Sequence, residues 1–140
     1  MPLKLLPALL LTLTSLFAQN PAGFVVWPKG VAPSKEGVKF DNHALNISHR
    51  EKSGVAELHE KQTDIFVIQS GEATLVVGGE VIDPKSSGPD EVRGSGIRGG
   101  VKTHLSAGDV VHIPAKMPHQ FFLDPGTQIT YFAVKVDERF

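Results

Sequence analysis

The stretch GDVVHIPAKMPH, residues 108–119, says most about the fold of this chain. A glycine–aspartate turn leads into the apolar run 110–113, which has the length and composition of a short β-strand. Residues 114–118 hold two prolines, which favour a tight connection over a continued strand. His119 then opens the next apolar run. The stretch predicts two short strands joined by a tight loop, with a histidine at the start of the second.

Similar short runs, separated by turn residues, continue along the chain. Between 40 and 49, Leu45 and Ile47 alternate with polar residues, which is the period of a half-buried strand. Further strand-like runs are 55–59, 65–69, 73–77, 97–105 and 128–136. We expect a turn at 70–72 and a polar surface excursion at 83–96. Many short strands without a helical period predict an all-β, closed or nearly closed antiparallel architecture.

A second informative segment is ELHEKQTDIFVIQSG, residues 57–71. Four residues separate His59 from Asp64, and six separate Asp64 from Gly71. This segment resembles the first motif of the cupin superfamily, His-x-His, three or four residues, a glutamate, six residues and a glycine. Glu57 and Asp64 stand where that motif has its first histidine and its glutamate.

Residues 108–119 resemble the second cupin motif, in which a glycine, a proline, a glycine and a histidine follow at fixed spacing. Gly108, Pro114 and His119 match it, whereas Lys116 stands at the second glycine and implies a loop able to hold a side chain there. The resemblance covers about residues 53–137. It implies a cupin-like double-stranded β-helix, a jelly-roll barrel, with a metal site inside.

The resemblance places Glu57, His59, Asp64 and His119 at the metal-ligand positions. Glu57 and His59 are two residues apart on a strand, so their side chains share a face. Two imidazoles and two carboxylates suit Mn²⁺, Fe²⁺, Zn²⁺, Ni²⁺ or Co²⁺ and do not choose among them. Two alternatives stay open: Glu57 is a rim carboxylate in a metal-free remnant, or Asp64 orients a histidine instead of binding the ion.

Other residues near these positions suggest a substrate pocket. Gln62 precedes Asp64 in a turn, where its amide can hydrogen-bond a bound molecule. Phe66, Phe121 and Tyr131 are candidates for the barrel core and for pocket walls. The remaining histidines lie outside the ligand positions: His43, His49, His104 and His112.

The N-terminal segment is expected to be a targeting sequence. Lys4 precedes an apolar run from Leu5 to Phe17, and Ala18 is a small residue suited to a cleavage site. The run is too short and too interrupted to predict stable membrane insertion. We therefore expect a cleaved signal peptide at 1–18, with an uncleaved anchor as the alternative, and a secreted or periplasmic protein.

Composition bounds the rest of the chain. The 140 residues suffice for one domain, which we divide into an arm at 19–38 and a barrel at 39–140. A formal net charge of −1 gives no electrostatic case for nucleic acid or an anionic membrane. The chain has no cysteine, so a metal must be held by nitrogen and oxygen atoms. The run Phe24 to Trp27 is expected to form a strand that adds to a neighbour's sheet, which favours a homodimer.

Three functions fit these expectations. The first is a metal-dependent enzyme that performs oxygenation, isomerisation or lyase chemistry on a small organic molecule. The alternative is a non-catalytic periplasmic binding module for a sugar or another small metabolite. The third is a structural domain with a vestigial pocket. A cupin-like fold does not separate them, because one fold hosts many functions.

Overall fold

The computed structural model describes residues 21–139, and these are built almost entirely from β-strands. One 3-10 turn, η1 (Pro28–Gly30), precedes the strands. The strands are β1 (Val38–Lys39), β2 (His43–Arg50), β3 (Ala56–His59), β4 (Gln62–Val77), β5 (Glu80–Ile82), β6 (Lys85–Gly88), β7 (Glu91–Gly94), β8 (Gly96–Arg98), β9 (Val101–Ser106), β10 (Val110–Ile113), β11 (His119–Phe122) and β12 (Ile129–Asp137). The predicted all-β class is confirmed.

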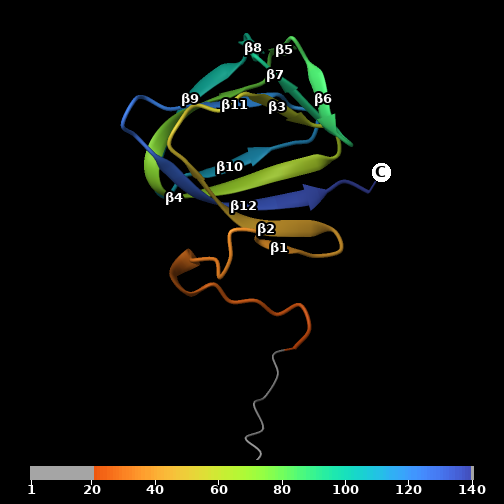
Figure 1. Cartoon of the computed structure of the whole chain (residues 1–140), viewed down its shortest axis with the longest axis vertical. Helices are drawn as coiled ribbons and strands as arrows, with labels where there is room; N and C mark the ends of the chain where they lie inside the picture. The colour runs from red at the N-terminus through yellow and green to blue at the C-terminus, as the bar shows by residue number, and fades with distance from the viewer. Residues whose placement is uncertain (1–20, 140) are drawn as a thin grey trace, which may run out of the picture.

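The long strand β4 belongs to both walls of a curled sheet (Figure 1). Its first part pairs with β10 and β12, and its second part pairs with β9 and β11. β2 and β1 extend the first wall beyond β12, while β3, β7 and β6 extend the second beyond β11. All these pairings are antiparallel, and β5 and β8 form a separate two-stranded sheet. The result is a rolled sheet with an interior.

The predicted turn at 70–72 is wrong, because β4 runs through it and bends at Gly71. Gly71 has a φ of 76°, and a Cβ at this position would collide with the carbonyl oxygen of Gln128. The pairing of β12 with β4 shifts register at the same level, between Thr130 and Tyr131. Glycine therefore lets one strand change direction here without ending.

Two other segments differ from the sequence-based expectation. The excursion expected at 83–96 contains the β6–β7 hairpin, whose polar residues hide the strand period. Phe24 to Trp27 is not a strand in the described chain. Trp27 instead packs its ring edge-on against Phe132, with ring centroids 5.9 Å apart. Side-chain packing, and not a backbone ladder, holds this part of the arm.

The barrel core lies between the two walls. Along β4, Asp64, Phe66 and Ile68 alternate onto the buried face, so a carboxylate lies in line with core side chains. The core cluster comprises Phe66, Ile68, Ala73, Leu75, Leu105, Ile113, Phe121, Ile129, Tyr131 and Ala133. The period of two thus carries a charged group into the interior.

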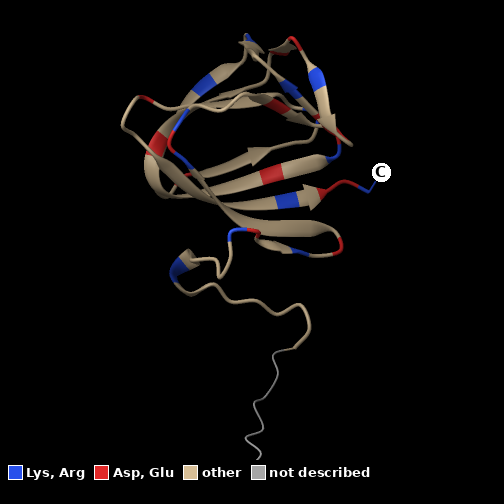
Figure 2. Cartoon of the chain, viewed as in Figure 1, with Lys and Arg blue, Asp and Glu red and all other residues tan. Residues whose placement is uncertain are grey.

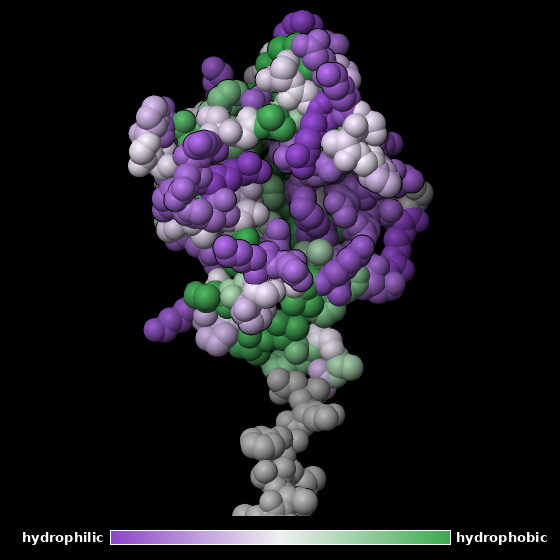
Figure 3. Space-filling model, in the orientation of Figure 1, coloured by the Kyte–Doolittle hydropathy of each residue, from purple (hydrophilic) through white to green (hydrophobic). Residues whose placement is uncertain are grey.

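On the face shown in Figure 3, the barrel surface is mostly hydrophilic, and hydrophobic side chains gather where the N-terminal arm meets the barrel. In that arm Phe24, Val26 and Val31 are 57%, 64% and 68% exposed. Within residues 21–139, no helix has the length and apolar character needed to cross a bilayer. The expected signal peptide at 1–18 lies outside the described residues.

Candidate metal centre

A cavity of about 590 Å³ opens between the two walls, near the end of β3, the start of β4 and the end of β12. The structure brings every predicted site residue to its lining: Glu57, His59, Gln62, Asp64, Phe66, His119, Phe121 and Tyr131. Such a volume is typical of a small-molecule site. Residues from both motifs, far apart in the sequence, therefore share one cavity.

The strand ladders explain how the two motifs meet. His119 on β11 lies directly opposite Glu57 on β3, and Glu57 and His59 share a face of β3. The connection between β10 and β11 is tied to the end of β3, because the Lys116 amide donates to the His59 carbonyl at 2.7 Å. Lys116 adopts a φ of 65°, the left-handed conformation that favours glycine. The loop thus keeps the conformation expected of glycine with a lysine in its place.

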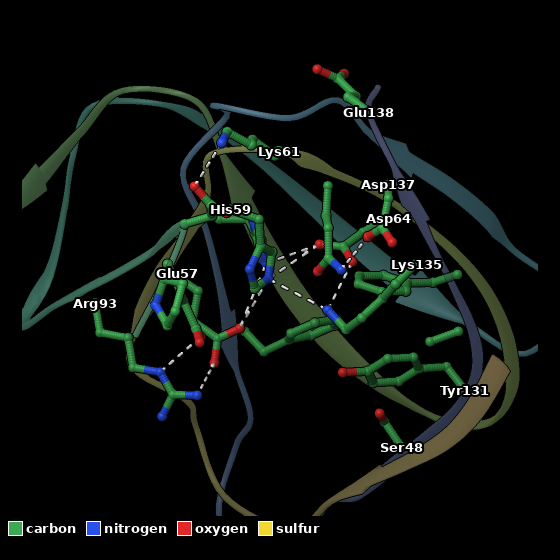
Figure 4. Close-up of a pocket in the computed structure, with 18 of the residues that line it drawn as sticks. Ser48, Glu57, His59, Lys61, Asp64, Arg93, Tyr131, Lys135, Asp137 and Glu138 are labelled. Carbon is green, nitrogen blue, oxygen red and sulfur yellow. Dashed lines mark hydrogen bonds and ion pairs between the residues drawn. The ribbon is translucent and has the colours of Figure 1, made fainter. Parts of the chain in front are cut away.

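Four ligand-type side chains converge in the cavity (Figure 4). The Glu57 Oε2 atom lies 4.0 Å from His59 Nε2 and 3.7 Å from His119 Nε2. One ligand atom from each of these three residues falls within 4.8 Å of the others, close enough to hold a common ion. Asp64 Oδ2 lies 3.4 Å from His59 Nε2 and 3.7 Å from His119 Nε2.

These separations fit a first-row divalent ion after a small contraction. With bonds of about 2.1 Å, ligand atoms of a tetrahedral site lie roughly 3.4 Å apart. The side chains of His59 and His119 are 11% and 4% exposed, so water competes little for their nitrogens. The His119 Nδ1 atom lies 3.3 Å from the Met117 carbonyl oxygen, so Nε2 is the ring nitrogen that faces the cavity. The donor set therefore suits a metal.

Asp64 differs from the other three because a lysine binds it. The Lys135 ammonium donates to Asp64 Oδ1 at 3.0 Å and lies 3.5 Å from His59 Nε2. Figure 2 shows the basic position of β12 beside an acidic position of β4. The group of three that can hold an ion does not include Asp64. Asp64 still faces the same two Nε2 atoms as Glu57, through its second oxygen.

The charges around the cluster keep its donors available. Burial raises the pKa of Glu57, but a hydrogen bond with His119 and the charges of Arg50, His119 and Arg93 outweigh this and lower the pKa to about 2. The pKa of His59 is also lowered, first by burial and then by the charge of Lys135. Glu57 is therefore ionised and His59 is held toward its neutral, metal-binding form.

The predicted substrate residues lie on two parts of the cavity wall. Phe66, Phe121 and Tyr131 form an aromatic cluster in which Tyr131 stacks on Phe121 at 5.2 Å between centroids and lies 4.7 Å from Phe66. Gln62 donates from Nε2 to Asp137 Oδ1 at 2.7 Å. The Gln62 amide nitrogen is therefore engaged within the protein.

Sequence reasoning missed four basic residues that line the cavity: Arg50, Lys61, Arg93 and Lys135. A signal for Lys135 existed, because Ile129, Tyr131 and Ala133 alternate onto the buried face of β12 and the period places Lys135 on that face. Arg93 lies 3.0 Å from Glu91 on its own strand, β7, and 3.9 Å from Glu57 on the neighbouring strand β3. No local pattern in the sequence predicts that ladder.

No family model matches the sequence, and no curated protein matches it. Solved structures do match. An uncharacterized conserved protein with a double-stranded beta-helix domain from Klebsiella pneumoniae is 16% identical, with a TM-score of 0.55, over 85% of this chain and 93% of that one.

Two enzymes share the fold more distantly. Hydroquinone 1,2-dioxygenase from Sphingomonas sp. TTNP3 is 14% identical, with a TM-score of 0.54, over 78% of this chain and 69% of that one. DMSP lyase DddQ from Ruegeria pomeroyi is 16% identical, with a TM-score of 0.51, over 71% of this chain but only 41% of the lyase. Together these similarities confirm the predicted double-stranded β-helix.

Proposed function

Because the chain has the double-stranded β-helix fold of the cupin superfamily, we propose that it is a metal-dependent enzyme acting on a small organic molecule. Glu57, His59 and His119 hold the ion, and Asp64 adds its free oxygen as a fourth donor. The observation that carries this proposal is the meeting of these side chains at one point of an open cavity.

The donor set accepts Mn²⁺, Fe²⁺, Zn²⁺, Ni²⁺ or Co²⁺. Such an ion supplies Lewis acidity or activates oxygen, according to its identity. The protein's own groups bind and orient the substrate and exclude water. Lys135 keeps a proton at Nζ beside the cluster, in reach of Asp64 Oδ1, where it can serve a general acid–base step.

The reaction class is oxygenation, isomerisation or lyase chemistry. Proteins with this fold include a dioxygenase and a lyase, and the fold alone does not choose between these reactions. Phe66, Phe121, Tyr131 and Gln62 are assigned to the substrate side of the cavity.

Elemental analysis of the purified protein tests the proposal, using expression of the full chain without a chelating tag. We expect close to one ion per chain in the wild type and a loss of about ten-fold or more in His59→Ala and His119→Ala. His104→Ala is the matched control, because His104 is 62% exposed and pairs with Glu72 away from the cavity. Equal metal in the wild type and His59→Ala contradicts the ligand assignment.

One observation favours the alternative, a non-catalytic binding module for a sugar or another small metabolite. Lys135 and Arg93 already lie within 4.0 Å of Asp64 and Glu57, so both carboxylates have cationic partners without an ion. A protein that binds no added metal but gains thermal stability from a sugar supports this alternative.

The proposed location is outside the cytoplasm, as a secreted or periplasmic protein cleaved after residue 18. The argument is the charged start and apolar run of residues 1–18. Mass spectrometry of the protein recovered from the periplasm or medium tests it, and an intact N-terminus at Met1 contradicts it. We also propose a homodimer, in which the exposed apolar arm contacts a second copy.

A further inference from the structure

We propose that the molecule bound in this cavity is a small organic carboxylate and that Arg50 binds its carboxylate group. The proposal rests on the proposed function in one respect, that this cavity is the substrate site. It adds the chemical class of the substrate and a residue that determines it.

Arg50 is held on two sides at the cavity wall. At the end of β2, its Nε donates to the Tyr131 hydroxyl at 3.1 Å, and its Cζ lies 5.1 Å from the centroid of the Phe121 ring. Stacking on an aromatic ring and a hydrogen bond from Nε fix the guanidinium plane. The two terminal nitrogens remain as donors in a fixed geometry. A pre-oriented guanidinium loses little entropy when it binds a carboxylate.

Arg50 also differs from the other basic residues of the cavity in its charge partners. Lys61, Arg93 and Lys135 each lie within 4.0 Å of a carboxylate, at 3.4, 3.0 and 3.0 Å. Among residues 21–139, Arg50 has no carboxylate within that distance. The charge of Arg50 acts on Glu57 only from beyond this distance. A carboxylate from a bound molecule would give the partly buried guanidinium a direct, charge-assisted hydrogen-bond partner.

The position of Arg50 suits a molecule that spans the cavity. In Figure 4, Tyr131, its hydrogen-bond partner, and Ser48 lie on the side of the cavity away from Lys61 and Glu138. Arg50 and the four ligand residues line the same cavity, so one molecule can contact both. The aromatic cluster beside Arg50 offers apolar contact for the body of such a molecule.

A carboxylate bound at Arg50 would be repelled by the negative charge of Glu57, whose pKa is lowered by the nearby charge of Arg50. A divalent ion on Glu57 would neutralise that carboxylate and leave the guanidinium for the incoming anion. The metal centre and the anion site therefore support each other, although Arg50 itself is not a metal ligand.

Matched pairs of acid and amide test the proposal without knowledge of the substrate. Acetate and acetamide, and benzoate and benzamide, are similar in shape and differ in charge. Isothermal titration is done on the full chain as purified, after chelation, and after loading with Zn²⁺. We expect the wild type to bind at least one acid about ten-fold or more tightly than its amide, as a charge-assisted hydrogen-bonded pair would give. Arg50→Gln removes this preference, and Arg50→Lys keeps part of it.

Arg98→Gln is the control, since Arg98 is 72% exposed and pairs with Glu80 at 3.6 Å outside the cavity. It should keep the full preference. The proposal is overturned if the wild type prefers the acid in neither of the two acid–amide pairs. This result does not depend on whether a variant folds. An unchanged preference in Arg50→Gln also overturns it, because the anion then binds elsewhere, for example on Zn²⁺.

The two proposals fail separately. If the wild type binds no metal and yet shows a preference for the acid that depends on Arg50, the metal centre is wrong and the anion site stands. If metal binds through His59 and His119 but the preference does not depend on Arg50, the metal centre stands and the anion site is wrong.

Discussion

Lys135 lies directly opposite Asp64 in the β12–β4 ladder, and its ammonium donates to the Asp64 carboxylate at 3.0 Å. The Asp64 side chain is 1% exposed, whereas that of Lys135 is 32% exposed. The lysine therefore satisfies a buried charge from the edge of the cavity. Of the two carboxylates in the cluster, Asp64 therefore has the closer cationic partner, since Arg93 lies 3.9 Å from Glu57.

The first prediction concerns this pair. Lys135→Met leaves the Asp64 carboxylate buried without its cation, so we expect the metal-free protein to lose about 1–3 kcal/mol of unfolding free energy. The double variant Lys135→Met with Asp64→Asn should lose less than Lys135→Met alone. Urea unfolding measures both. The control is Lys61→Met, because Lys61 and Asp90 are 65% and 48% exposed and such a pair is worth about 1 kcal/mol or less. Equal losses for Lys135→Met and Lys61→Met contradict this account.

The second prediction separates the two carboxylates of the cluster. Glu57→Gln should weaken metal binding more than Asp64→Asn, because Lys135 binds Asp64 at 3.0 Å whereas Arg93, the cation that pairs with Glu57, is 3.9 Å away. Competition with a metal-sensitive dye measures the dissociation constants. Glu72→Gln, at a 56% exposed side chain on the outer face, should have no effect. A larger loss in Asp64→Asn would make Asp64 the main carboxylate ligand and Glu57 a rim residue.

The third prediction uses the left-handed conformation of Lys116. Lys116→Gly should stabilise the protein by about 0.5–1 kcal/mol, since glycine adopts this φ without steric cost. The greater conformational entropy of glycine in the unfolded chain offsets part of this stabilisation. Lys102→Gly, at the second residue of strand β9, should destabilise the protein instead. Thermal and urea unfolding report both changes. Stabilisation by Lys116→Ala to the same extent would show that the backbone conformation is not the cause.

The fourth prediction concerns the bend in β4. Gly71→Ala should cost about 2 kcal/mol or more, because the new Cβ meets the Gln128 carbonyl in addition to an unfavourable φ. Gly126→Ala is matched in backbone conformation, with a φ of 81°, but its Cβ would have no atom within 4 Å. It should therefore cost only the backbone contribution of about 1–2 kcal/mol. Identical losses for the two variants contradict a steric role for Gln128.

The fifth prediction tests the proposed homodimer. Phe24→Ser combined with Val26→Ser removes two exposed apolar side chains of the arm, so we expect a shift from dimer to monomer. Light scattering after size-exclusion chromatography measures the mass. Val110→Ser, at a 70% exposed position on β10, is the control and should remain dimeric. A monomeric wild type contradicts the proposal.

The all-β class follows from local sequence signals, and the ligand positions follow from the resemblance of two short segments to the cupin motifs. Period-two alternation, turn residues and the spacing of His59, Asp64 and His119 are properties of short segments. Lys135 and Arg50 depend on something else, the pairing of β12 with β4 and β2, which joins residues about seventy to eighty positions apart. Register between distant strands is set by the packing of the whole barrel. The period of two places Lys135 on the buried face of β12, but only the ladder with β4 shows that it faces Asp64. The sequence predicts a turn at Gly71, where the structure has a bend within β4, because glycine is common in both.

The continuous course of β4 has a consequence for how this cavity exchanges its contents. A single covalent backbone runs from Asp64, beside the imidazoles, to Val77, opposite His119 in the second wall. Because β4 is hydrogen-bonded in both walls, separating the walls would require β4 to bend further or to lose part of its pairing. We therefore expect ligands to enter past the surface turns around the opening. Substitutions in these turns can alter which molecules enter, while the strands that carry the ligand-type residues keep their positions.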